Sequence, residues 1–264
     1  MTAPCLRQRA LDALLLREPA AKAQAVRELA AADLAVDADR VFPPPAGLPG
    51  RPDRPLLVAP KDVPTRSPFT PEGRIALLHA IAHIEFNAIN LALDAVWRFP
   101  GMPEAFYRDW LRVAAEEALH YTLLAEHLAT LGARYGDCLA HDGLWTMCEK
   151  TAGDILARMA LVPRTLEARG LDATPLIQAK LLKAGDARAV EMLDVILRDE
   201  VGHVAIGNRW FRHLCEQRAI DPVARYPELV AQYEAPRLKP PFNLAAREAA
   251  GFTPEELTWL AGWE

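Results

Sequence analysis

The stretch Arg198-Asp199-Glu200-Val201-Gly202-His203 and its counterpart Ala115-Glu116-Glu117-Ala118-Leu119-His120 indicate how this chain folds. Each contains Glu-x-x-His within a segment patterned as a long helix, and an acidic residue precedes each glutamate. Residues three positions apart lie on one face of a helix, with Cβ atoms roughly 5–6 Å apart. A carboxylate and an imidazole placed in this way can bind one metal ion.

A further glutamate precedes each of these pairs at nearly the same distance. Glu85 lies 32 residues before Glu117, and Glu167 lies 33 residues before Glu200. Each interval fits one helix of about twenty-five residues, a turn and the return to the same depth. A single Glu-x-x-His would carry little weight, because it arises by chance. The doubled unit predicts a dinuclear carboxylate site in a four-helix bundle, with a glutamate from every helix and a histidine from two of them.

Apolar periodicity predicts the four helices of this bundle at residues 71–99, 103–131, 144–169 and 186–217. Thr70 is the expected N-cap of the first helix, with Pro71 in its first turn. Pro163 lies one turn before Glu167 and predicts a kink or bulge there. A shorter helix is expected at 176–183, between the third and fourth. In each long helix a glutamate interrupts an otherwise apolar stripe.

The remaining segments predict an arm before the bundle and a cap after it. Residues 1–40 suggest two short amphipathic helices. Ten of the 31 residues from 41 to 71 are proline, which predicts an extended segment. We expect an ordered strap that buries Leu56, Leu57, Val58 and Phe69, and the alternative is a disordered linker. The expected parts are therefore 1–70, 71–219 and 220–264, within one compact domain.

The C-terminal part is expected to be largely irregular after Asp221-Pro222, with two short helical pieces. One carries Arg247. The other is opened by Thr253-Pro254-Glu255-Glu256, which has the pattern of a capping box.

Composition narrows the class of protein. Hydrophobic residues make up 51% of the chain and the net charge is −5, which argues against nucleic acid or an anionic membrane as a partner. A nucleic-acid partner would require a local basic patch, for which Arg158 and Arg164 are the candidates. No apolar run reaches the roughly 18 residues of a membrane span. The four scattered cysteines and the absence of a signal-peptide pattern lead us to expect free thiols and a cytoplasmic protein.

Burying four carboxylates together requires compensation, because even one unpaired buried charge costs several kcal/mol. Two divalent cations would balance the four glutamates, with neutral imidazoles as further ligands. Mixed carboxylate and imidazole donors suit iron, which we expect, or manganese. The expected ligands are Glu85, Glu117, His120, Glu167, Glu200 and His203. The alternative is that these residues form surface salt bridges.

Two acidic residues next to the ligands are candidates for orienting the histidines. Metal-binding histidines usually donate their second ring N–H to a carboxylate or carbonyl. We expect Asp199 to orient His120 and Glu116 to orient His203, across a helix pair. The alternative is that both acids face solvent or basic neighbours.

The ligand pattern resembles the ferritin-like diiron-carboxylate superfamily, which includes ferritins, rubrerythrins, bacterial multicomponent monooxygenases and the diiron tRNA hydroxylase. That resemblance covers residues 71–219. A closer resemblance, to a bacterial ferritin-like family of unknown function, covers most of the chain. It is carried by His83-Ile84-Glu85, Glu116-Glu117-Ala118-Leu119-His120, Asp199-Glu200-Val201-Gly202-His203 and Pro241-Phe242-Asn243…Ala246-Arg247…Ala250-Gly251-Phe252. It implies an all-α, ferritin-like antiparallel four-helix bundle with an N-terminal arm and a C-terminal cap. The arm and cap depart from ferritin itself and argue against cage assembly and iron storage.

Three functions remain open at this point. The first is an oxidase or hydroxylase that activates O₂ at two ferrous ions, as the superfamily resemblance implies. The second is a metal-binding or peroxide-scavenging protein without an organic substrate, and the third is a helical module with structural metals. The expected partners are O₂ or peroxide, a small-molecule substrate that no residue identifies, and an electron-transfer protein. The expected state is a monomer or a homodimer.

Overall fold

The computed structural model describes residues 5–262, and these form helices and connecting segments with no β-strand. An isolated parallel bridge between Leu57 and Ala140 is the extended pairing found there. The chain divides into two compact units, Met1–Trp145 and Thr146–Glu264, called here the N-terminal and C-terminal units. The predicted all-α class is therefore confirmed, and the four cysteines are free as expected.

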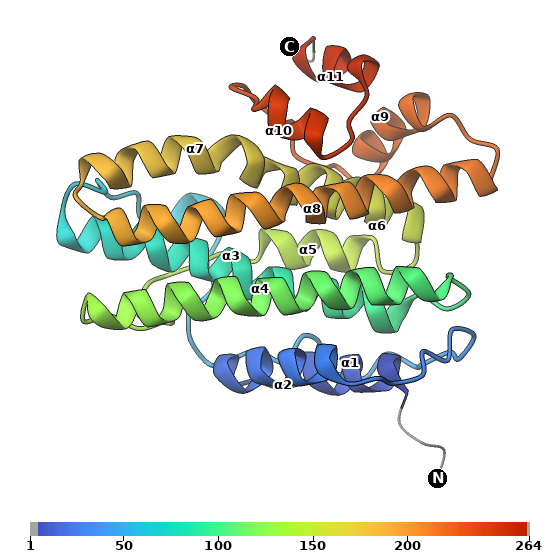
Figure 1. Cartoon of the computed structure of the whole chain (residues 1–264), viewed down its shortest axis with the longest axis horizontal. Helices are drawn as coiled ribbons and strands as arrows, with labels where there is room; N and C mark the ends of the chain where they lie inside the picture. Colours follow the sequence, from blue (N-terminus) through green and yellow to red (C-terminus); the bar gives the residue numbers. More distant parts are fainter. Residues whose placement is uncertain (1–4, 263–264) are drawn as a thin grey trace. The chain divides into compact units, whose positions relative to one another are not determined.

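The N-terminal unit is built around a helical hairpin. Its helices are α1 (Leu6–Leu14), α2 (Pro19–Ala31), the 3₁₀ helix η1 (Pro60–Asp62), α3 (Pro71–Arg98) and α4 (Glu104–Thr130), and α5 (Gly143–Lys150) begins in it. The long helices α3 and α4 pack against each other, with α1 on α3 and α2 on α4 (Figure 1). The predicted bounds of α3 and α4 are confirmed to within one residue. Thr70 Oγ1 accepts a hydrogen bond from Gly73 N at 3.1 Å, which confirms the N-cap.

Helix α3 is the most apolar helix of this unit. By length and composition alone it could cross a membrane, but 72% of its most apolar 18-residue window is buried inside the structure. The helix also carries buried polar side chains, among them Glu85 and Asn90. Burial of this extent, with polar groups inside the apolar stripe, is typical of a helix in the core of a packed protein.

Arg7 joins α1 to the C-terminal end of α3. Its fully buried guanidinium donates hydrogen bonds to the carbonyl oxygens of Val96 and Trp97, at 3.3 and 2.7 Å. The last carbonyls of a helix have no partner within it, so a side chain that reaches them satisfies groups that would otherwise be buried and unbonded. Arg7 Nη1 also donates to three carbonyls within residues 37–40.

The proline-rich arm is held to the rest of its unit by other contacts than the predicted burial of its hydrophobic side chains. Leu56, Leu57 and Phe69 were expected to be buried, but they are 53%, 40% and 59% exposed. Backbone hydrogen bonds hold the arm instead: Gly50 N donates to Leu14 O, and residues 56–58 exchange two bonds with Ala140. Leu56 and Leu57 are adjacent and both exposed, so the hydrophobic content of the arm alone does not predict which of its side chains are buried.

The C-terminal unit contains a second long hairpin and the C-terminal helices. Its elements are the rest of α5, α6 (Ile155–Leu161), the π-helix η2 (Val162–Glu167), α7 (Ala168–Lys183), α8 (Ala187–Gln217), α9 (Pro222–Gln232), α10 (Leu244–Ala249) and α11 (Pro254–Ala261). Helices α7 and α8 lie side by side (Figure 1), and η2 and α6 also pack on α8. The predicted span of α8 is confirmed, and so is a backbone irregularity at Pro163.

Two predictions about this unit are wrong. The third long helix does not run unbroken over 144–169: a turn at 151–154 separates α5 from α6, where Asp154 caps α6 by accepting from Leu156 N and Ala157 N. Nor does the helix end at residue 169, because α7 continues to Lys183 and includes the shorter helix expected at 176–183.

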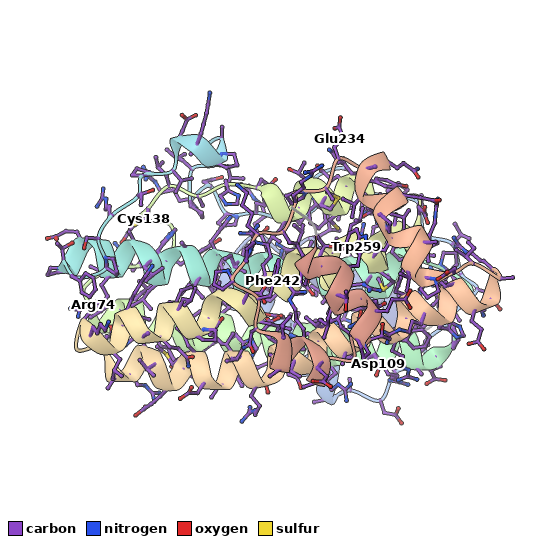
Figure 2. The ribbon with its side chains drawn as sticks, turned by 90° about the horizontal axis from the view of Figure 1, so that it is seen from above. Arg74, Asp109, Cys138, Glu234, Phe242 and Trp259 are labelled. Atoms are coloured by element: carbon purple, nitrogen blue, oxygen red, sulfur yellow. The ribbon has the colours of Figure 1, made fainter. Side chains whose placement is uncertain are left out.

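The C-terminal segment is more helical than expected, because α9 occupies residues 222–232. Its last helix begins with a complete capping box: Thr253 N donates to Glu256 Oε2 and Glu256 N donates to Thr253 Oγ1. Phe242, just before α10, and Trp259, on α11, are labelled in Figure 2.

Candidate metal centre

Three of the predicted ligands meet in the N-terminal unit. Glu85 projects from α3, and Glu117 and His120 project from α4 one turn apart. His120 Nδ1 lies 3.2 Å from Glu85 Oε2 and 3.4 Å from Glu117 Oε2. Each of the three side chains offers one ligand atom within 4.8 Å of the others. The hairpin thus places two carboxylates and one imidazole around a common point.

These three side chains are removed from solvent. Glu85 is 4% exposed, and Glu117 and His120 are fully buried. Burial by itself lowers the pKa of His120, but hydrogen bonds and charges from Glu117 and Glu85 outweigh it and raise the pKa to about 11. Without a metal, the imidazolium therefore supplies one positive charge, which offsets one of the two buried carboxylates.

A divalent ion fits this group by its charge and by its donor chemistry. Its two positive charges would balance Glu85 and Glu117, and His120 would then be a neutral nitrogen ligand. Oxygen and nitrogen donors of this kind suit iron, manganese and related divalent ions. The protein side of the site is assembled by two consecutive helices, because a short connection between α3 and α4 sets their relative depth.

The C-terminal unit carries the second Glu-x-x-His pair on α8. His203 Nδ1 lies 3.6 Å from Glu200 Oε1, and both residues are buried. Glu167, the remaining predicted ligand, is half-buried at the last position of η2. A Cβ atom at Gly170, in the first turn of α7, would lie 4.0 Å from Glu200 Oε2. The first turn of α7 therefore packs next to the Glu200 carboxylate of α8.

The position of Glu167 depends on how η2 packs on α8. Pro163 has no N–H to donate and cannot continue an α-helical ladder, and the chain widens here into a π-helix. Thr165 Oγ1 donates to Ala160 O at 2.8 Å across this wider turn. A Cβ atom at Gly207 of α8 would lie 2.6 Å from Pro163 Cβ and Cγ. The close approach of η2 to α8 therefore requires glycine at position 207.

The residues expected to orient the histidines stay predictions. Asp199 is ion-paired with Arg198, whose Nε lies 2.9 Å from Asp199 Oδ1, and Glu116 is half-buried on α4.

Arg158 and Arg164, the two candidates for a basic surface patch, are 1% and 2% exposed. They therefore do not form such a patch. Arg158 donates to Thr151 Oγ1 and Cys148 O within its own unit.

Sequence reasoning missed a set of buried ion pairs in the C-terminal unit. Arg164 Nη2 donates to Glu256 Oε1 at 2.6 Å, across 92 residues, and Arg247 donates through Nε and Nη2 to Asp172. The capping box made Glu256 visible in the sequence, but only as a helix cap. No local sequence pattern predicts an ion-pair partner that is so distant in the sequence.

Comparisons with known proteins place the chain in a family. A family model described as "Protein of unknown function (DUF455)" matches residues 15–258. An "Uncharacterized protein" of Haemophilus influenzae is 56% identical over 216 residues, which cover 79% of this chain and 75% of the relative. No solved structure matches the chain.

Proposed function

The chain belongs to the DUF455 family of proteins of unknown function, and we propose that it is a dinuclear metal protein that activates O₂. One set of ligands is Glu85, Glu117 and His120, and the other is Glu167, Glu200 and His203. The proposed metal is iron, with manganese as the alternative. In this proposal the two helical hairpins form a ferritin-like four-helix bundle around the two ions.

The observation that carries the proposal is the arrangement of Glu85, Glu117 and His120. Two carboxylates buried within hydrogen-bonding distance of one imidazole are costly unless a cation or a proton compensates them. The second unit repeats the same residue types at the same helical spacing, with Glu200 and His203 3.6 Å apart. This repetition is the reason for proposing two ions rather than one.

When bound, two ferrous ions would supply the electrons that reduce O₂. The chain's own contribution would be to bind and orient them and to exclude water. His120 Nδ1, which faces both carboxylates, would exchange its proton for a metal ion. Buried apolar residues on the same helix faces, such as Ile89 on α3 and Leu124 on α4, keep the surroundings dry.

Metal analysis of anaerobically purified protein tests the site. The double variant Glu117→Ala, Glu200→Ala should lose most of the iron or manganese that the unchanged protein carries. The matched control is Glu126→Ala, Glu216→Ala, which removes one exposed glutamate from each of the same two helices. Equal metal content in the double variant and the unchanged protein would end the assignment.

Oxygen consumption tests the reaction. Protein loaded with ferrous iron should take up O₂ and become ferric much faster than the Glu117→Ala, Glu200→Ala variant. Full metal binding without O₂ uptake would reject the oxidase reading and leave a metal-binding protein without that activity. Uptake of peroxide in place of O₂ would support the peroxide-scavenging alternative.

A further inference from the structure

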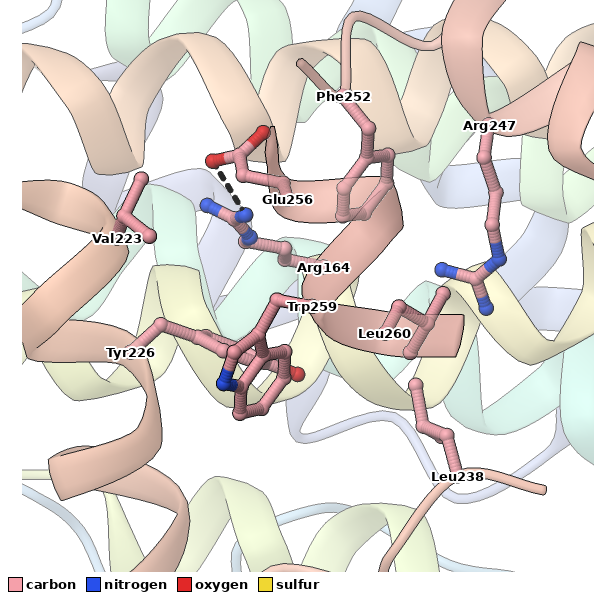
Figure 3. Close-up of a pocket in the computed structure, with 9 residues that line it drawn as sticks. All are labelled: Arg164, Val223, Tyr226, Leu238, Arg247, Phe252, Glu256, Trp259 and Leu260. Carbon is pink, nitrogen blue, oxygen red and sulfur yellow. Dashed lines mark hydrogen bonds and ion pairs between the residues drawn. The ribbon is translucent and has the colours of Figure 1, made fainter. Parts of the chain in front are cut away.

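A pocket in the C-terminal unit lies between η2 and the C-terminal helices (Figure 3). It encloses about 350 Å³ of empty space, part of which opens to solvent. Arg164 comes from η2, Tyr226 from α9, Arg247 from α10, and Glu256 and Trp259 from α11. Four helices thus contribute side chains to one pocket, and none of these side chains belongs to the candidate metal centre.

The charged groups around the pocket do not balance. Arg164 and Arg212 share one carboxylate, since Glu256 Oε1 accepts from the former at 2.6 Å and Oε2 from the latter at 2.8 Å. Arg247 forms its ion pair within residues 5–262 with Asp172. Three guanidinium groups therefore face two carboxylates. Burial raises the pKa of Glu256, but the charge of Arg164 and its other partners outweigh this and lower it, so Glu256 is an anion.

The two arginines that line the pocket are buried, whereas the side chain of Arg212 is 33% exposed. Arg164 is 2% exposed and Arg247 is fully buried. Each of them has one carboxylate partner, Glu256 for Arg164 and Asp172 for Arg247, so an anion that enters the pocket would gain hydrogen bonds from N–H groups that these carboxylates leave unused. Within residues 5–262, Arg164 Nε and Nη1 and Arg247 Nη1 have no hydrogen-bond acceptor. Guanidinium N–H groups are donors only, and a carboxylate or phosphate is their natural acceptor.

The rest of the lining is apolar and aromatic. The Arg164 and Arg247 Cζ atoms lie 5.0 and 5.3 Å from the centre of the Phe252 ring, and Figure 3 shows the two guanidinium groups on either side of it. The Tyr226 and Trp259 rings meet edge to face at 5.4 Å. Small-molecule sites typically combine a mostly apolar wall with a few charged groups that set the orientation of the ligand.

We propose that this pocket binds a small organic anion, with its carboxylate or phosphate on the free N–H groups of Arg164 or Arg247 and its apolar body against Trp259 and Tyr226. The proposal is independent of the metal centre. The occupant is a molecule with one oxoanion and an apolar body, because the wall combines buried arginines with aromatic rings. A purely structural role, in which the arginines only hold the C-terminal helices, is the competing outcome.

Isothermal titration of metal-free, full-length protein tests the proposal. The probes are benzoate and phenyl phosphate, with benzyl alcohol as the uncharged counterpart and inorganic phosphate as the head group alone. At least one of the two organic anions should bind with one-to-one stoichiometry, at least about tenfold more tightly than benzyl alcohol or inorganic phosphate, as expected for hydrogen bonds to a charged group plus apolar burial. Comparing benzoate with phenyl phosphate identifies the preferred head group.

Two variants localise the binding. Arg164→Lys keeps the charge but removes the free Nε–H and Nη1–H, and Val223→Phe fills the wall of the pocket; each should weaken binding about tenfold or more. Arg237→Lys, an exposed arginine beside the lining residue Leu238, is the matched control and should bind as the unchanged protein does. If Arg164→Lys fails to fold, Val223→Phe decides.

Three results would overturn the proposal. The first is that neither organic anion binds the unchanged protein. The second is that benzyl alcohol or inorganic phosphate binds as tightly as the better organic anion. The third is that the folded pocket variants bind as tightly as the control.

Discussion

His120 Nδ1 on α4 lies 3.2 Å from Glu85 Oε2 on α3, although 35 residues separate them. This contact joins the histidine of a Glu-x-x-His pair to the glutamate that precedes the pair by one helix. This contact therefore brings Glu85 together with Glu117 and His120, so that the α3–α4 hairpin places three candidate ligand side chains at one point.

Replacing Glu85 with glutamine should weaken metal binding. The amide is a poorer ligand and removes one of the two negative charges that a divalent ion would balance. We expect the affinity for Fe²⁺ or Mn²⁺ to fall about a hundredfold, because the loss of even an outer-shell partner costs roughly 10–100-fold. Anaerobic titration against a chelator of known affinity measures this. Glu126→Gln, on the exposed face of α4, should bind as before, and an unchanged affinity in Glu85→Gln would contradict its role as a ligand.

Gly207→Ala should destabilise the protein. The new methyl group would meet Pro163 at 2.6 Å, so η2 must move away from α8. We expect a loss of about 1–3 kcal/mol in the free energy of unfolding, as for other overpacked contacts. Urea denaturation of metal-free protein measures it.

Gly202→Ala is the matched control on the same helix. A Cβ atom there meets nothing within 4 Å, so the substitution should stabilise by up to about 1 kcal/mol through helix propensity. Equal effects of the two substitutions would show that helix propensity, and not the contact with Pro163, governs position 207.

Lys22 should make stability depend on pH. Its Nζ is fully buried and donates to Gly50 O and Asn90 Oδ1, and desolvation lowers the pKa of Lys22 to about 7, helped by Arg51. Between this value and the unfolded pKa of about 10.4, the unfolded chain binds a proton that the folded chain does not. Stability contributed by this group should therefore rise with pH from about 7 upward, by at most about 1.4 kcal/mol per pH unit.

The comparison that isolates this effect is between the unchanged protein and Lys22→Met. Between about pH 7 and about pH 9 the free energy of unfolding of the unchanged protein should rise relative to that of Lys22→Met. Titrating groups that the two proteins share contribute equally to both and cancel in the difference. Lys61→Met, at an exposed position of η1, should preserve the original pH dependence. Parallel curves for the unchanged protein and Lys22→Met would mean that Lys22 stays charged in the folded state.

Arg7→Lys should cost about 3 kcal/mol or more of stability. A lysine has three donors and no planar fork, so it leaves several of the carbonyls that Arg7 bonds without a partner in a buried position. Thermal and urea unfolding measure the loss. Arg9→Lys, on the exposed side of α1, should change stability by less than about 0.5 kcal/mol. A comparably small effect of Arg7→Lys would show that water can replace these bonds.

The sequence by itself determined the long helices α3, α4 and α8 and the closeness of each Glu-x-x-His pair. Caps, periodicity and the three-residue spacing act within a few residues, so they can be read directly from the order of the side chains. The cap at Thr70 and the capping box at Thr253 are visible for the same reason.

Only the tertiary structure decided which distant groups meet. It joins Glu85 to His120, fits Pro163 against Gly207, and pairs Arg164 with Glu256. It also breaks the third predicted helix and leaves the leucines of the arm exposed. These outcomes depend on the fit of surfaces far apart in the chain, and no local pattern encodes that fit because packing energy arises only when both surfaces are in place.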